Sequence, residues 1–405
     1  MSMPTKHRPK RRRVQEEEPA PPCIPKHINQ SPPSPMNDSH EIKHCRVIAS
    51  YNWIADSNPT IMIPGRPRTV SLESRSISKS TSKSIPRSVN SYIHDPNTTS
   101  YPAYPLLPAL EALLHTHPSY DTVSIDVVTC SQTIEHLLRL LFEKGSRFRI
   151  LLQAFGNTVF FLPRQETQDL RPDLKGYRDS FPEWVAPWSQ DVSGSRSHHR
   201  VLEYEIGGLK CVVSGEGEGY VPEFEKGKGR AVERNPEAEA EAVGEEFTAL
   251  SGYSEDSEPL LILEGGAAVP RNAVCDIETC SVLNQSQGQN QNEVVDHQKM
   301  ARMWARQVQN TLVGFHQDGV FSRVEVKNVR DEIMEWQSAQ GKRIKKFTEL
   351  LGEMVDFARM RQGRMFELRN GERGLEMKDV DGVNPLVPDK LAMRIEIEIL
   401  LDLLE

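Results

Sequence analysis

The chain has 405 residues, of which 37% are hydrophobic, and it carries a formal net charge of −8. The negative charge excludes a generally basic surface, so binding to nucleic acid must depend on a local patch. The six cysteines form no Cys-x-x-Cys pair and no apolar run reaches membrane length, which argues against a structural zinc site, a secreted disulfide scaffold and a membrane span.

The first 44 residues are rich in proline, serine and charge, and we predict that they form a disordered tail. Within this tail, residues 9–14 read PKRRRV, a compact basic cluster that is typical of a nuclear import signal. A solvated basic tail has the same composition, so a second interpretation stays open. The cluster therefore predicts a nuclear location, with a cytoplasmic one as the alternative.

One folded domain is expected over residues 45–405, interrupted by disordered insertions at about 71–90 and 223–258. These insertions show no apolar period, and they cannot bury enough apolar surface to offset the entropy of ordering them. The predicted elements of the first half are helices at 106–117 and 131–145, a strand at 122–130, and a hairpin at 148–163 that turns at Gly156-Asn157.

A second hairpin covers residues 199–216 and turns at Gly207-Gly208, with apolar residues alternating along both arms so that one face can pack. Beyond the acidic insertion, the predicted elements are a strand at 273–282, a loop at 284–292, a helix at 294–307, a strand pair at 310–326, and helices at 331–360 and 389–405. Strands interleaved with helices indicate an α+β fold, in which a mixed β-sheet core has flanking helices.

The second hairpin ends in two glutamates, Glu216 and Glu218, with glycines on either side. Side chains two residues apart on a strand point to the same face. Two carboxylates that share a face repel each other unless a positive charge, most often a divalent metal ion, lies between them. A strand that runs into an acidic loop has the same sequence, so the pattern leaves a metal site and a plain loop open.

Four motifs follow one another along the chain: SGEGEG, DIET, MWARQ and LVGFHQDG, with GYRDSFPE upstream of them. In this order they resemble the eukaryotic decapping exoribonucleases, and the resemblance implies a PD-(D/E)xK nuclease-like fold. The sequence is also similar to uncharacterised fungal proteins that are sometimes labelled geranylgeranyl pyrophosphate synthetases. Prenyl-diphosphate synthases need paired DDxxD motifs to hold Mg²⁺-diphosphate, and this chain contains no Asp-Asp pair. We therefore reject that activity.

The resemblance implies a metal-dependent site that acts on RNA 5′ ends. It makes Glu216, Glu218 and Asp276 ligands of Mg²⁺ or Mn²⁺, and it adds Glu166 as a further carboxylate. Gln307 would orient the substrate or a water molecule. Carboxylates of this kind hold metal ions that activate a water and neutralise charge on the leaving phosphate oxygen.

The position of the family's catalytic lysine carries Glu278 when the DIET motif is aligned on Thr279, and Cys280 when the register is shifted. Loss of one well-placed cation costs on the order of 3 kcal/mol of transition-state stabilisation. The sequence therefore predicts a degenerate member with weak or no hydrolysis of RNA 5′ ends, which binds RNA, a nucleotide or a nuclear exonuclease partner. The alternative is an active metal-dependent phosphodiester or pyrophosphate hydrolase. On the degenerate interpretation, Glu278→Lys is expected to raise activity.

Overall fold

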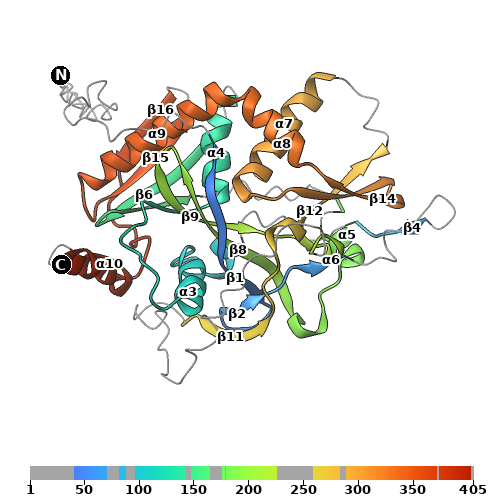
Figure 1. Cartoon of the computed structure of the whole chain (residues 1–405), viewed down its shortest axis with the longest axis horizontal. Coiled ribbons are helices and arrows are strands. Elements are labelled where there is room, and N and C mark those ends of the chain that lie inside the picture. The colour runs from blue at the N-terminus through green and yellow to red at the C-terminus, as the bar shows by residue number, and fades with distance from the viewer. Residues whose placement is uncertain are drawn as a thin grey trace, which may run out of the picture.

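The structure, a computed structural model, contains two β-sheets with helices packed around them (Figure 1). The described residues are 41–70, 82–87, 96–142, 147–164, 176–177, 179–225, 259–282, 289–371 and 374–402. Most of the predicted tail and of both predicted insertions lies outside them, so the disorder of these segments stays a prediction. None of the described helices is both long enough and apolar enough to span a membrane.

The larger sheet has ten strands in the order β11-β2-β1-β8-β9-β5-β7-β6-β15-β16. Its strands in chain order are β1 (Lys43–Ile54), β2 (Thr60–Gly65), β5 (Val127–Cys130), β6 (Phe148–Phe155), β7 (Thr158–Pro163), β8 (Ser195–Ile206), β9 (Leu209–Glu216), β11 (Leu261–Gly266), β15 (Met365–Gly371) and β16 (Gly374–Asp379). Strand β5 runs parallel to both β7 and β9, whereas β8 and β9 are antiparallel. The predicted mixed sheet is therefore confirmed.

Both predicted hairpins form around glycines that adopt positive φ. Gly156 has a φ of 56° between β6 and β7, and Gly207 and Gly208 have φ of 61° and 86° between β8 and β9. Residues with a Cβ rarely adopt this left-handed region, so the glycines fix where each chain reversal occurs. The alternating apolar residues of the second hairpin enter one core, as predicted: Leu202, Tyr204, Ile206, Cys211 and Val213.

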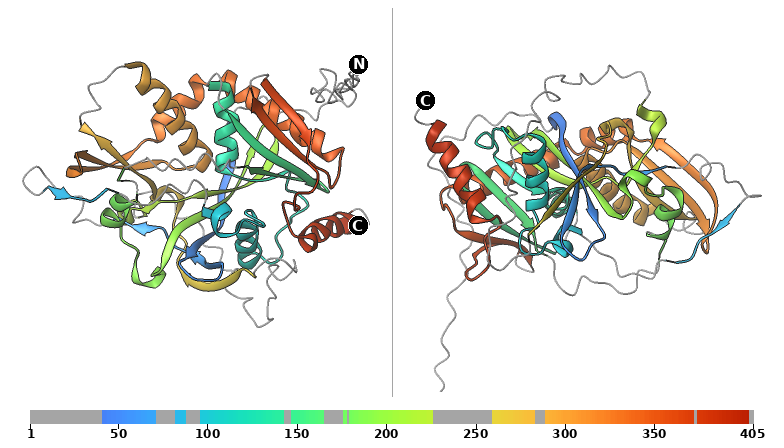
Figure 2. Two further views of the ribbon diagram at one scale, coloured as in Figure 1. Left: turned by 180° about the vertical axis from the view of Figure 1, so that it is seen from behind. Right: turned by 90° about the horizontal axis from the view of Figure 1, so that it is seen from below.

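Helices cover both faces of the larger sheet, and two hydrophobic cores result (Figure 1, Figure 2). The helices are α2 (Pro96–Ser100), α3 (Leu107–Thr116), α4 (Ser131–Phe142), α5 (Ser180–Val185), α6 (Pro222–Glu225), α7 (Gln289–Arg306), α8 (Arg330–Ala339), α9 (Gly341–Arg359) and α10 (Asp389–Asp402). Helices α4, α7 and α9 pack on one face, while α3 and α10 pack on the other. Neighbouring residues of β6 enter different cores, Ile150 the first and Leu151 the second, because side chains alternate along a strand.

The smaller sheet has six strands in the order β3-β10-β12-β13-β14-β4. These are β3 (Arg68–Thr69), β4 (Lys83–Ser84), β10 (Gly219–Tyr220), β12 (Val274–Ser281), β13 (Asn310–Gln317) and β14 (Val320–Asn328). Strands β12 and β13 are parallel and are connected through α7, as parallel neighbours require a crossover. The crossover carries α7 across the polar face of β12, where the candidate site lies (Figure 1).

The structure differs from the sequence-based expectations in four elements. The helix predicted over 331–360 is two helices, α8 and α9, because Gln340 leaves helical geometry with φ of −97° and ψ of 9°. Helix α7 begins at Gln289, inside the predicted loop, and the predicted strand at 122–130 is reduced to β5. The hairpin of β15 and β16, which pairs with β6 through β15, was not predicted.

Candidate functional site

The two glutamates that end the second hairpin lie where the chain passes from one sheet to the other. Strand β9 ends at Glu216 in the larger sheet, and β10 begins at Gly219 in the smaller one, so Glu218 lies in the link between the sheets. The chain passes close to β8 at this point, and a Cβ on Gly217 would lie 3.3 Å from Arg200 Nε. The expectation that both glutamates share one strand face is therefore wrong, because the chain changes sheets between them.

Three carboxylates nevertheless gather beside β12. Asp276 is fully buried, and Glu278 follows two residues later on the same strand. The Ile277 amide between them donates a hydrogen bond of 2.6 Å to Glu218 Oε2. The link between the sheets thus brings the Glu218 side chain against the same strand that carries the other two carboxylates.

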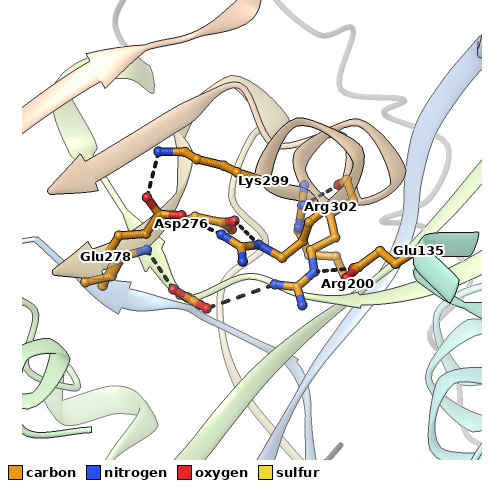
Figure 3. A network of polar contacts seen from close by, with 9 residues as sticks. Glu135, Arg200, Asp276, Glu278, Lys299 and Arg302 are labelled. Carbon is orange, nitrogen blue, oxygen red and sulfur yellow. Dashed lines mark hydrogen bonds and ion pairs between the residues drawn. The ribbon is translucent and has the colours of Figure 1, made fainter. Parts of the chain in front are cut away.

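Helix α7 presents three cations to these carboxylates. Lys299, Arg302 and Arg306 are three and four residues apart, so they lie along one face of the helix. We call them the α7 cation stripe. Lys299 Nζ lies 2.6 Å from Glu278 Oε2, and Arg302 Nη2 lies 2.5 Å from Glu278 Oε1 (Figure 3). Arg302 Nε also lies 3.2 Å from Asp276 Oδ2, so one guanidinium joins both carboxylates of β12.

The third cation of the stripe extends the network toward the larger sheet. Arg306 Nε lies 3.5 Å from Glu135 Oε1 on α4, and Arg306 Nη1 lies 4.0 Å from Glu218 Oε1. Arg200, which is fully buried on β8, donates from Nη2 to the backbone carbonyl of Arg306 over 2.8 Å. The network therefore connects α4, β8, β12 and α7, as Figure 3 shows.

The electrostatic environment keeps the guanidiniums of this network charged. Burial by itself lowers the pKa of Arg302, but the nearby Asp276 and Glu278 carboxylates outweigh it and raise the pKa above its usual range. Burial lowers the pKa of Arg200 to about 10, with Asp276 opposing the shift. Both side chains therefore carry a positive charge at neutral pH.

The carboxylate arrangement does not fit a divalent metal ion. Within the part of the chain that the structure describes, no group of three or more His, Cys, Asp and Glu side chains is placed to hold one. The oxygens of Asp276 and Glu278 that face α7 are in contact with cations instead. A hard cation such as Mg²⁺ needs several free oxygen ligands, so we derive no chemical step through a metal here.

Three predicted site residues remain, and one of them, Glu166, lies outside the described residues. Glu216 is a nearby negative charge for Arg68 of β3 and also for Arg306 of the α7 cation stripe. Gln307 follows the end of α7 with a φ of 51°, and its Nε2 donates to the Trp304 carbonyl over 2.7 Å. It lines a cavity of about 230 Å³ between α7 and α8, which none of the predicted carboxylates lines.

The sequence-based prediction did not include the positively charged side chains of the site. The spacing of Lys299, Arg302 and Arg306 within a predicted helix was available as a signal of one charged face. Arg200 gave no comparable signal, because it is a single arginine at the end of a polar run on a strand, and neither did Glu135 on an amphipathic helix.

The chain belongs to the family described as "Domain of unknown function (DUF8563)", which matches residues 22–395. A search of the curated proteins found no match. Among solved structures, the chain is similar to Rai1 of Scheffersomyces stipitis in complex with (3′-NADP)⁺ and calcium ion, with a TM-score of 0.53 and 13% identity over 85% of this chain and 91% of that chain.

Two further solved structures have comparable similarity. Dxo1 of K. lactis in complex with manganese gives a TM-score of 0.52 at 8% identity over 85% of this chain and 92% of that chain. Rai1 of Candida albicans in complex with pU5-Mn²⁺ gives a TM-score of 0.50 at 12% identity over 87% of this chain and 95% of that chain. The predicted resemblance to decapping exoribonucleases and the predicted α+β class are thus confirmed for the fold.

Proposed function

We propose that this protein is a degenerate, decapping-nuclease-like protein that binds an RNA 5′ end or a nucleotide and hydrolyses it weakly or not at all. The observation that carries the proposal is the set of contacts that the Glu278 carboxylate makes. With the DIET motif aligned on Thr279, Glu278 takes the position of the family's lysine, and its carboxylate contacts Lys299 and Arg302. A carboxylate there cannot supply the positive charge that a lysine would place beside the transition state.

A pair of side chains beside the site supports binding of RNA or a nucleotide. The Arg68 guanidinium lies over the Trp188 ring, 4.5 Å from its centroid. Arg68 is on β3, which pairs with β10 directly after Glu218. The Trp188 indole nitrogen is buried and has no hydrogen-bond partner among the described residues. Tryptophan rings and guanidinium planes stack on unpaired bases, and a guanidinium also binds phosphate.

The ligands named for the similar structures belong to those proteins, namely pU5 with Mn²⁺ and (3′-NADP)⁺ with calcium. They support RNA 5′ ends and nucleotides as the ligand class of this chain. The proposal also includes a nuclear location, supported by the basic cluster at residues 9–14 outside the described part of the chain.

The test uses a 3′-labelled RNA of about 20 nucleotides, prepared with a 5′ monophosphate, a 5′ triphosphate or an unmethylated cap. We expect the full-length RNA to persist with Mn²⁺ and the wild-type protein, while fluorescence anisotropy detects binding. Trp188→Ala and Arg68→Ala should weaken binding. Arg323→Ala is the matched control, because Arg323 lies over Phe315 in a similar pair, 3.9 Å from the ring centroid.

Two results would contradict the proposal. Complete hydrolysis of the RNA by the wild type that disappears in Asp276→Asn would establish the active hydrolase instead. Failure of every RNA to bind, or equal binding by the wild type, Trp188→Ala and Arg68→Ala, would remove RNA as the ligand.

A further inference from the structure

The carboxylates of the site come from separate parts of the chain, and one helix supplies cations to all of them. Glu135 lies on α4, Glu218 on the link between the sheets, and Asp276 and Glu278 on β12. Each of the four has an oxygen within 4.0 Å of a nitrogen of the α7 cation stripe. Without these cations, four negative charges would face one another.

We propose that the α7 cation stripe takes the place of the divalent cations at this site, so that the carboxylates are neutralised and held together without metal. This inference rests on the proposed function in one respect, because it treats the site as non-catalytic. When cations are removed from α7, the site should bind a divalent metal ion.

Burial makes these ion pairs strong enough for that role. The Asp276 side chain is 1% exposed, Lys299 is 22% exposed and Arg302 is 30% exposed. Salt and water screen such partly buried pairs much less than surface pairs. The pairs also connect α7 to both sheets, because Glu218 lies where the chain passes from one sheet to the other.

The geometry also excludes a metal ion while the stripe is in place. An ion bound by Asp276 Oδ2 and Glu278 Oε1 would meet Arg302, whose nitrogens lie 3.2 and 2.5 Å from those two oxygens. Like charges at such distances repel strongly in a partly buried site. Asp276 Oδ1 is buried without a hydrogen-bond partner among the described residues, so Asp276 keeps a free ligand oxygen once Arg302 is removed.

The experiment measures Mn²⁺ binding by isothermal titration and by the melting temperature in Mn²⁺ against a chelator, using the full-length protein. The wild type should show no saturable site and no difference in melting temperature. The double variant Lys299→Gln, Arg302→Gln should bind Mn²⁺ at least about tenfold more tightly than the wild type and melt higher in Mn²⁺ than in chelator. Adding Asp276→Asn to it should abolish the gain.

Two control variants separate charge from packing. Arg302→Lys keeps the positive charge and should remain insensitive to Mn²⁺, like the wild type. Arg323→Gln removes an exposed arginine elsewhere and should not create a site.

A folded double variant that gains no Mn²⁺ affinity would overturn the inference. So would a wild-type Mn²⁺ site that Asp276→Asn removes, and this result does not depend on the double variant folding. The readout is metal binding alone, so its failure is distinct from failure of the proposed function. If the wild type hydrolyses RNA in the presence of chelator, the proposed function fails while the metal-free site stands.

Discussion

Glu278→Lys is the substitution that most sharply separates the sequence-based expectation from the structure. With the DIET motif aligned on Thr279 it restores the lysine of the family pattern, and on the sequence alone it should raise activity. In the structure, the Glu278 carboxylate lies 2.6 Å from Lys299 Nζ and 2.5 Å from Arg302 Nη2. A lysine at this position removes both ion pairs and places a third cation beside two others, so we expect loss of stability instead.

The size of the expected stability loss follows from how deeply the ion pairs of Glu278 are buried. Glu278, Lys299 and Arg302 are 24%, 22% and 30% exposed, so the pairs are neither fully buried nor on the open surface. Breaking a buried pair costs about 3–5 kcal/mol, and exposed pairs contribute about 1 kcal/mol or less. We therefore expect Glu278→Lys to lower the free energy of unfolding by about 2–4 kcal/mol, because the new lysine can extend partly into solvent.

Urea denaturation followed by tryptophan fluorescence measures this loss as a shift of the midpoint at constant slope. Glu278→Gln should lose less, because it adds no positive charge. Glu325→Lys is the matched control, since its partner Arg323 lies 3.2 Å away with both side chains more than half exposed. It should lose about 1 kcal/mol or less. The charge exchange Glu278→Lys with Lys299→Glu should recover part of the stability.

The reasoning is refuted if Glu278→Lys unfolds at the same urea concentration as the wild type. It is also refuted if Glu278→Lys hydrolyses RNA without losing stability. That outcome would mean that the missing lysine alone limits activity and that α7 does not hold the Glu278 carboxylate.

Three further predictions concern other parts of the chain. Burial, with help from nearby His199 and Arg200, lowers the pKa of His198 well below its usual range, so only the unfolded chain gains this proton as the pH falls below about 6.5. The free energy of unfolding should therefore fall between pH 7 and pH 5, and by less in His198→Gln; an equal loss would contradict this. A methyl group at Gly314 would lie 2.2 Å from Phe181 Cζ, so Gly314→Ala should lose about 1–3 kcal/mol in urea denaturation, partly recovered by Phe181→Leu. Replacing residues 10–13 with alanine should move a fluorescently tagged protein out of the nucleus, and an unchanged nuclear fraction would reject the import signal.

Local patterns were enough to predict two hairpins and the longer helices. The second hairpin was predictable because alternation assigns Leu202 and Tyr204 to one face, and because the Gly207-Gly208 pair can adopt the positive φ of the turn. The break between α8 and α9 was missed, because one apolar period continues across it, although Gly341 directly after Gln340 is a helix-stop signal.

The sequence by itself determined the hairpins, most of the helices and the nuclease-like fold. Only the tertiary structure decided which charges meet. Glu216 and Glu218 are neighbours in sequence, but they do not share one strand face, because the chain changes sheets between them. Lys299 and Arg302 reach β12 only because a crossover helix packs over that strand. Ion pairing depends on distance and burial in the folded chain, and a motif specifies neither.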